Sequence, residues 1–218
     1  MSGLLRMEHK MSGHVFARLN GYAYSLLPFA PYSIDRVDNT SDTVIRVSSG
    51  DRSVVLDFTR PDFAPRLTHA QSVSEVVEIS PGDEVKRWSI ETTSFQTTWP
   101  RGFSVRSAEW DWPLFELVAT EGSVIWFQGC FPNATAERMT APGSVLRAQG
   151  DSRLWHWYEF AYEHDHTKYL QRWYVKSFDA NQKLIITAQA PEAQCDPVFH
   201  AAEEFAESFK SKSAQRIR

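Results

Sequence analysis

Histidines and carboxylates cluster in one stretch of the C-terminal half of the chain. The stretch contains His156, Glu159, Glu163, His164, Asp165 and His166. Neutral imidazole and carboxylate groups are ligands for zinc and other divalent ions. However, the last residues of the stretch form a polar segment of the kind found at an exposed hairpin tip, and no His-Glu-x-x-His pattern is present. We therefore interpret His156, Glu159, His164 and His166 as a solvated polar cluster, and a metal-dependent enzyme is the least supported hypothesis.

The sequence carries no signature of nucleophilic or phosphate chemistry. It has no Gly-x-Ser-x-Gly elbow and no glycine-rich loop that leads into a helix. Cys130 follows a predicted strand, but a catalytic thiol needs a histidine beside it, and the sequence alone places none there. We therefore assign no catalytic, cofactor-binding or metal-binding residue, and we favour a binding protein over an enzyme.

Large aromatic residues are unusually frequent. The 218 residues include 8 Trp and 14 Phe, and such side chains dominate the packing of small cores. Where they remain exposed instead, they become the anchors of interfaces with other proteins. The candidate binding surface consists of Trp110, Trp112, Phe115, Trp155, Trp157 and Trp173.

Charge and cysteine content restrict the class of protein. The net charge is −4, and the basic residues cluster only in the tail after Lys210, which is not the pattern of a nucleic-acid-binding protein. Two cysteines are too few for a disulfide-rich secreted domain, so buried free thiols are expected. No long apolar run follows the first charged residues, so neither a signal peptide nor a membrane span is expected. These features predict a cytoplasmic protein with no membrane or nucleic-acid partner.

The N-terminal half is predicted to be mostly strands. Residues 1–13 have the composition of a flexible leader, and a strand is expected over residues 22–27. Residues 43–48 and 53–59 are β-like runs around a turn that contains Gly50, which is typical of a hairpin. Further strands are expected over residues 73–79, 85–93, 114–120 and 123–129.

The C-terminal third has the clearest pattern. Aromatic residues occupy both faces of a predicted strand over residues 154–162, further strands are predicted over residues 169–178 and 184–190, and the short turns between these runs predict an antiparallel meander. The period then changes to that of a helix, with Asp196 as its N-cap and Pro197 at its first position. The apolar stripe of this helix contains Val198, Ala202, Phe205 and Phe209.

The predicted fold class is α+β, an antiparallel meandering β-sheet packed by a C-terminal α-helix. We expect a single domain over residues 14–210, with a possible sub-boundary near residue 95, and a basic tail over residues 211–218. No internal repeat or low-complexity linker interrupts this domain.

The C-terminal half resembles the PsbP-like proteins. The resemblance rests on the strand 184–190, the Pro191-Glu192 loop and a helix that ends at Phe205-Ala-Glu-Ser208-Phe209. The segment Trp99-Pro-Arg-Gly-Phe103 is similar to the opening strand of that family. The resemblance covers at most residues 95–210, implies the α+β fold and a small binding or accessory protein, and brings no catalytic residue.

Two functional hypotheses follow from these observations. The first is a bacterial accessory protein, immunity-like or chaperone-like, that acts through a protein partner. The second is a small-molecule-binding protein or an enzyme of unknown class. Its aromatic pocket would lie between the sheet and the helix and would be lined by Trp155, Trp157, Trp173 and Tyr174.

Overall fold

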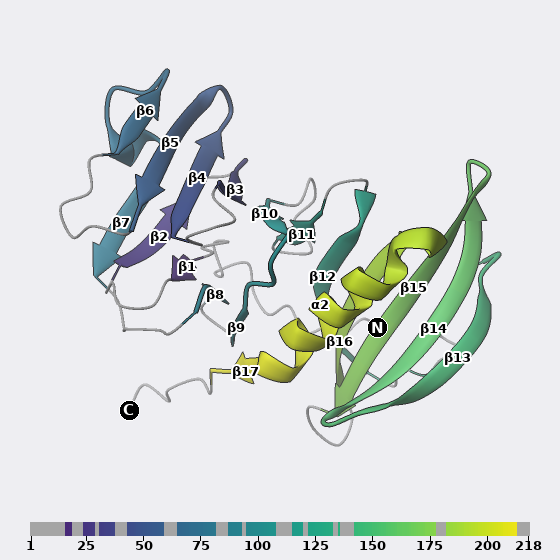
Figure 1. The fold of residues 1–218 in the computed structure, drawn as a ribbon. Helices are drawn as coiled ribbons and strands as arrows, with labels where there is room; N and C mark the ends of the chain where they lie inside the picture. Colours follow the sequence, from purple (N-terminus) through teal and green to yellow (C-terminus); the bar gives the residue numbers. More distant parts are fainter. Residues whose placement is uncertain are drawn as a thin grey trace, which may run out of the picture. The chain divides into compact units, whose positions relative to one another are not determined.

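The computed structural model describes the chain in segments: residues 16–18, 24–28, 31–37, 43–58, 65–81, 87–92, 95–107, 115–119, 122–132, 135, 142–177 and 182–212. Antiparallel strands dominate these residues, and the α-helix α2 (Cys195–Ser208) follows the last long strand (Figure 1). The predicted antiparallel sheet with a C-terminal helix is therefore confirmed, although the protein is more β-rich than an ordinary α+β protein.

The chain forms two compact units. The first comprises Met1–Tyr32, Val37–Thr98 and Phe209–Arg218, and the second comprises Ser33–Arg36 and Trp99–Ser208. Each unit is therefore built from segments that are separated in the sequence. The chain enters the long second part of unit 2 at Trp99.

Unit 1 contains one sheet whose strands come from both ends of the chain. Their order across the sheet is β17 (Lys210–Ser211), β9 (Phe95–Thr98), β8 (Ser89–Glu91), β1 (Phe16–Arg18), β2 (Tyr24–Pro28) and β7 (Val77–Pro81). The C-terminal strand β17 pairs with β9, and Phe209 stacks on Phe95 with ring centroids 4.9 Å apart.

Unit 1 also contains the predicted hairpin around Gly50. β4 (Val44–Ser49) pairs with β5 (Arg52–Asp57), and β6 (Arg66–Thr68) pairs with β5. Gly50 has a φ of 62°, a conformation that glycine adopts without steric cost. The alternation predicted from the sequence is confirmed, because Ile45, Val47, Val54 and Leu56 are fully buried.

Unit 2 is one antiparallel sheet with α2 against it (Figure 1). Its strand order is β13 (Val145–Ser152), β14 (Trp155–His164), β15 (Thr167–Ser177), β16 (Gln182–Pro191), β12 (Val124–Pro132), β11 (Glu116–Val118), β10 (Ser104–Arg106) and β3 (Ser33–Arg36). The meander β14–β15–β16 agrees with the three runs predicted from alternation.

Helix α2 buries one apolar side against the sheet. Val198, Ala202 and Phe205 are buried, as predicted, and Phe199, Ala201 and Ala206 are buried with them. Two side chains of the sheet donate hydrogen bonds to the helix backbone: Trp155 Nε1 to the Ala206 carbonyl at 2.9 Å and the Tyr174 hydroxyl to the Phe199 carbonyl at 3.1 Å. These bonds fix the position of the helix along the strands.

Several sequence predictions are wrong in detail. Val73–Glu75 forms a 3-10 turn rather than the start of a strand. A 3-10 turn, Glu192–Gln194, precedes α2, so Asp196 lies within its first turn rather than at the N-cap. Phe209 leaves the helix stripe and packs in unit 1. Strand β13 was not predicted, and residues 99–103 form a turn between β9 and β10 rather than a strand.

Candidate functional site

The long strands of unit 2 present two chemically different faces. Successive side chains of a strand point to opposite faces, and the bonds from Trp155 and Tyr174 to α2 identify the face that the helix covers. The opposite face carries the neighbours of these residues in the sequence. We call it the aromatic face and define it by Trp126, Tyr158, Phe160, Tyr162, Tyr169 and Trp173.

The centre of the aromatic face is a row that crosses neighbouring strands. Trp126 of β12 is opposite Thr187 of β16, Thr187 is opposite Trp173 of β15, and Trp173 is opposite Tyr158 of β14. Trp126, Trp173 and Tyr158 are partly exposed, whereas Thr187 is fully buried. Each aromatic side chain of this row therefore rests on the sheet with part of its surface open.

Amide groups hold the central tryptophan in place. Trp173 Nε1 donates to Gln171 Oε1 at 2.7 Å, and Gln171 Nε2 donates to Gln189 Oε1 at 3.1 Å. Next to these hydrogen-bonded side chains, the Thr187 hydroxyl is buried and has no hydrogen-bond partner within the described residues. Because Trp173 is hydrogen-bonded in the free protein, little conformational entropy is lost when it contacts a ligand.

Ring contacts extend the aromatic face toward the β14–β15 hairpin tip. Phe160 meets Trp173 edge to face at a centroid distance of 6.1 Å, and Tyr162 stacks on Tyr169 at 5.4 Å. Partial burial, and then the neighbouring Tyr169, raise the pKa of the Tyr162 hydroxyl. The phenol is therefore uncharged at neutral pH. Tyr162 and Tyr169 are partly exposed and form a neutral, largely apolar surface, whereas Phe160 is buried beneath the face.

The helix-covered face contains a charged cluster around Arg172. Its guanidinium contacts Glu159 at 2.8 Å and Glu203 of α2 at 3.2 Å. It also lies 4.4 Å from the Trp157 ring centroid and 4.2 Å from that of Phe199, so it is flanked by two aromatic rings. Cation–π contacts of this kind are strongest where water is excluded.

The environment of this cluster shifts two pKa values. Burial tends to lower the pKa of Arg172, but the hydrogen bond that it donates to Glu159 and the neighbouring Tyr174 outweigh this effect, and the pKa is raised. Burial also raises the pKa of Tyr174 well above its ordinary value. Arg172 is thus charged and Tyr174 neutral at any physiological pH, which suits a structural role in joining the helix to the sheet.

The structure separates the residues predicted as a binding surface. Trp173 lies on the aromatic face, whereas Trp155 and Trp157 lie on the helix-covered face. Trp155 and Phe115 are almost fully buried, and Trp157 is partly exposed beside Arg172. Trp110 and Trp112 lie outside the described residues. Trp155, Trp157 and Tyr174 therefore share a face that Trp173 does not, so these four side chains do not line one cavity.

The predicted polar cluster is also divided. Glu159 is buried against Arg172, whereas His156 lies on the opposite face of β14 and contacts Asp151 at 2.8 Å. His164 and His166 are at the hairpin tip, with side chains 71% and 102% exposed. Within the described residues, no group of three His, Cys, Asp or Glu side chains is arranged to hold a metal ion.

Sequence reasoning missed Arg172, Gln171 and Gln189. The sequence does contain a signal for Arg172: with successive side chains on opposite faces of a strand, Arg172 and Glu159 fall on the same face of neighbouring strands, as an ion pair requires. Cys195, predicted to be buried, is a partly exposed free thiol. Its pKa is raised first by burial and then by Asp196, which is opposite to the shift that activates a nucleophilic thiol.

Comparison with known proteins finds no matching family model, no matching curated protein and no matching solved structure. Among the described residues, no helix combines the length and the apolar character needed to cross a bilayer.

Proposed function

We propose that this protein is a binding protein that acts through a protein partner held on the aromatic face of unit 2. The observation that supports the proposal is the row Trp126, Trp173 and Tyr158, whose side chains are partly exposed and are supported by one rigid sheet. Trp and Tyr are the residue types that contribute most binding energy at protein interfaces.

The chemistry of the row favours a polypeptide over a polyanion. The described positions at its centre carry aromatic, amide and hydroxyl groups (Trp173, Gln171, Gln189 and Thr187) and no lysine or arginine. Nucleic acids are bound mainly through phosphate contacts from basic side chains. Charged residues, Glu116 and then Arg106, follow only beyond Trp126. An aromatic centre flanked by amides instead complements the apolar side chains and backbone amides of a polypeptide.

Site-specific photo-crosslinking in the native cell tests this proposal. A photoreactive amino acid is placed at Tyr158, on the aromatic face, and as a control at Glu204, on the exposed side of α2. We expect one protein to be crosslinked in high yield from position 158 and not from position 204. Equal yields from both positions, or no crosslinked protein from position 158, would contradict the proposal.

Affinity measurements with the crosslinked protein then test the anchor. Trp173→Ala is expected to weaken binding about 30-fold, the effect of losing an interface hot spot of about 2 kcal/mol. Leu154→Ala is the matched control, because Leu154 is also an exposed apolar residue, in the turn before β14. Thermal unfolding of both variants checks that each is folded. Equal losses in the two variants would exclude Trp173 as an anchor.

A further inference from the structure

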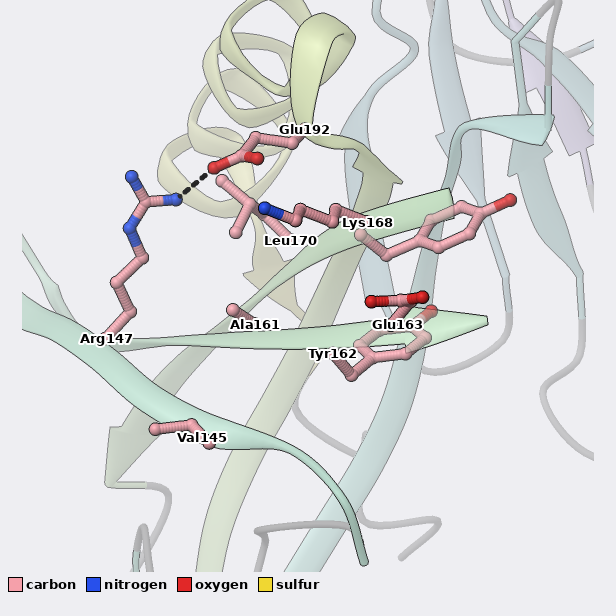
Figure 2. A pocket seen from close by; sticks show the side chains of 9 residues that line it. Val145, Arg147, Ala161, Tyr162, Glu163, Lys168, Leu170 and Glu192 are labelled. Carbon is pink, nitrogen blue, oxygen red and sulfur yellow. Dashed lines mark hydrogen bonds and ion pairs between the residues drawn. The ribbon is translucent and has the colours of Figure 1, made fainter. Parts of the chain in front are cut away.

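A hollow lies at the end of the β14–β15 hairpin of unit 2, where Tyr162 and Tyr169 line it together with side chains of the helix-covered face. It has a volume of about 330 Å³, at the small end of the range for ligand sites. Its apolar lining comes from Val145, Ala161 and Leu170 of three neighbouring strands, and Figure 2 shows charged side chains around it. The size suits one aliphatic side chain with a small polar group attached.

The charges around this hollow are unevenly satisfied. Arg147 is paired with Glu192 at 2.8 Å (Figure 2), and a carboxylate oxygen of Glu163 lies 4.0 Å from Nδ1 of His166. Lys168, which faces Glu163 across the strands, makes no ion pair within the described residues. One cation is therefore available to a ligand, whereas Glu163 beside it disfavours any ligand that carries more than a single negative charge.

The hollow lies at one end of an open sheet edge. β13 is the last strand in the sheet order, and its described neighbour is β14 alone. Val145 and Leu146 are 68% and 44% exposed at its start. An edge strand offers unpaired backbone groups to an incoming strand, and strand addition of this kind is a common mode of peptide recognition.

The direction of β13 decides which end of a peptide reaches the hollow. A strand added antiparallel to β13 runs from Ser152 toward Val145, so that its C-terminus arrives beside the lining residues. The register of β13 against β14 shifts between Leu146 and Ala148, which places Arg147 in a bulge. Pairing with β14 continues on both sides of this bulge, but bulges re-aim side chains and disrupt the ladder locally, so regular pairing of an added strand would be interrupted at Arg147, beside the hollow.

We propose that the outer edge of β13 and this hollow bind the C-terminal segment of a polypeptide that ends in an aliphatic residue. The last side chain occupies the space between Val145, Ala161 and Leu170, and the terminal carboxylate pairs with Lys168 beside Arg147. Residues further upstream add to the sheet along Ala148–Ser152. This site shares Tyr162 and Tyr169 with the aromatic face but includes none of the central row Trp126, Trp173 and Tyr158, so changes in that row test the first proposal alone.

Binding of fluorescein-labelled octapeptides to the full chain tests the proposal. The probes are two pools with random residues before a C-terminal Leu, Val or Ile, one with a free carboxylate and one with a C-terminal amide, and the readout is fluorescence anisotropy. We expect the carboxylate pool to bind and the amide pool to bind at least about tenfold more weakly, because the charged hydrogen bonds are lost. Equal binding of both pools, or no binding at about 1 mM protein, overturns the proposal.

Charge variants separate the site from general electrostatics. Lys168→Glu is expected to weaken the binding of the peptide pool with the free carboxylate at least about tenfold. Lys210→Glu, an exposed lysine of unit 1, changes the net charge equally and is expected to bind as the unaltered protein does. Equal losses in the two variants overturn the assignment of Lys168.

Two further controls identify the occupant. Free leucine at the concentration of the peptide is expected not to displace the peptide, because a single amino acid cannot pair with β13. Complete displacement by free leucine overturns the polypeptide proposal in favour of a small-molecule site. Trp173→Ala is expected to leave peptide affinity unchanged. A parallel loss of peptide affinity in this variant would place the peptide on the aromatic face and overturn the proposed site.

Discussion

At the scale of single residues, Arg172 of β15 connects the neighbouring strand β14 with helix α2. It contacts Glu159 on the adjacent strand, Glu203 on α2, and the rings of Trp157 and Phe199. A charge removed from water in this way is stabilised only while its partners are present. The cluster therefore holds the helix in one position on the sheet but makes each partner difficult to replace.

Glu159→Ala is expected to lower the free energy of unfolding by about 2–3 kcal/mol, because it leaves Arg172 largely buried without its closest carboxylate. Urea unfolding at pH 7 measures the change. Glu203→Ala is the control, since its side chain is 37% exposed and exposed pairs contribute about 0–1 kcal/mol. A loss in Glu203→Ala as large as that in Glu159→Ala would show that the two carboxylates are equivalent.

Tyr174 makes the protein less stable at alkaline pH. Burial raises the pKa of its hydroxyl above the ordinary value, so the folded protein keeps a proton that the unfolded chain loses. Stability is therefore complete below about pH 10, the ordinary tyrosine pKa, and falls as the pH rises above it. Tyr174→Phe is expected to cost about 1 kcal/mol at pH 7, through the lost hydrogen bond to Phe199, and to flatten this alkaline decline.

Unfolding curves of both proteins between pH 7 and pH 11 provide the measurement. Tyr32 is also buried and its pKa is also raised, so a residual decline remains in Tyr174→Phe. Tyr158→Phe is the matched control, because Tyr158 is a partly exposed tyrosine of the same sheet. An alkaline decline of the same slope in Tyr174→Phe and the unaltered protein would rule out Tyr174 as its source.

At the scale of elements, the sequence predicts strands best where both faces are regularly occupied. β14 and β15 carry aromatic residues on both faces, β16 contains the apolar run 184–186, and the turn around Gly50 marks the β4–β5 hairpin. The sequence does not predict β13, because Val145–Ser152 is an exposed edge strand that is mostly polar after Leu146. A strand with little buried surface does not need alternating apolar residues. The division into two faces was predictable, but the choice of the face that α2 covers was not.

The same limit applies to the candidate site. The sequence predicts Trp173 and Trp155 as parts of one binding surface, because residue type alone does not distinguish a core tryptophan from a surface one. The position of α2 determines which tryptophan is buried. Trp155 donates a hydrogen bond to the backbone of α2, whereas Trp173 donates to Gln171 on the other face of the sheet. Tertiary packing of α2 is long-range information that local periodicity does not contain.

The pairing of β13 with β14 depends on a glycine opposite a tryptophan. Gly150 faces Trp157, and a Cβ added at residue 150 would lie 2.6 Å from the Trp157 ring. Gly150→Ala is therefore expected to destabilise the protein by about 1–3 kcal/mol, although alanine ordinarily stabilises a strand relative to glycine. Displacement of Trp157 from Arg172 is also expected to change the tryptophan fluorescence.

Urea unfolding and emission spectra of Gly150→Ala provide the measurement, and Gln149→Ala is the control. Gln149 precedes Gly150 on β13, is exposed and points to the other face, so its replacement is expected to change stability by less than about 0.5 kcal/mol. If Gly150→Ala is as stable as the unaltered protein, the ring does not lie over residue 150 in solution.

At the scale of the whole molecule, the chain does not divide into consecutive domains. Ser33–Arg36 belongs to unit 2 and pairs with β10, while the segment after Ser208 belongs to unit 1 and pairs with β9. A cut near residue 98 would therefore remove a strand from each unit. Such exchanges are not visible in a sequence, because short edge strands carry little pattern of their own.

The C-terminal segment is expected to stabilise unit 1 rather than unit 2, to which its helix belongs. β17 pairs with β9, Phe209 stacks on Phe95, and Lys212 forms an ion pair with Glu91 of β8. Deletion of residues 209–218 is therefore expected to increase amide hydrogen exchange at least about tenfold over β8 and β9 while the exchange of β14–β16 is unchanged.

Hydrogen exchange measured by mass spectrometry compares this deletion with a shorter one. Removal of residues 213–218 alone keeps Phe209, β17 and Lys212, so it is expected to leave exchange in β8 and β9 as it is in the full chain. Equal effects of the two deletions would assign the stabilisation to the basic tail instead of to β17. A faster exchange over β14–β16 after deletion of 209–218 would show that the segment supports both units, because α2 and β17 would then act as one continuous element.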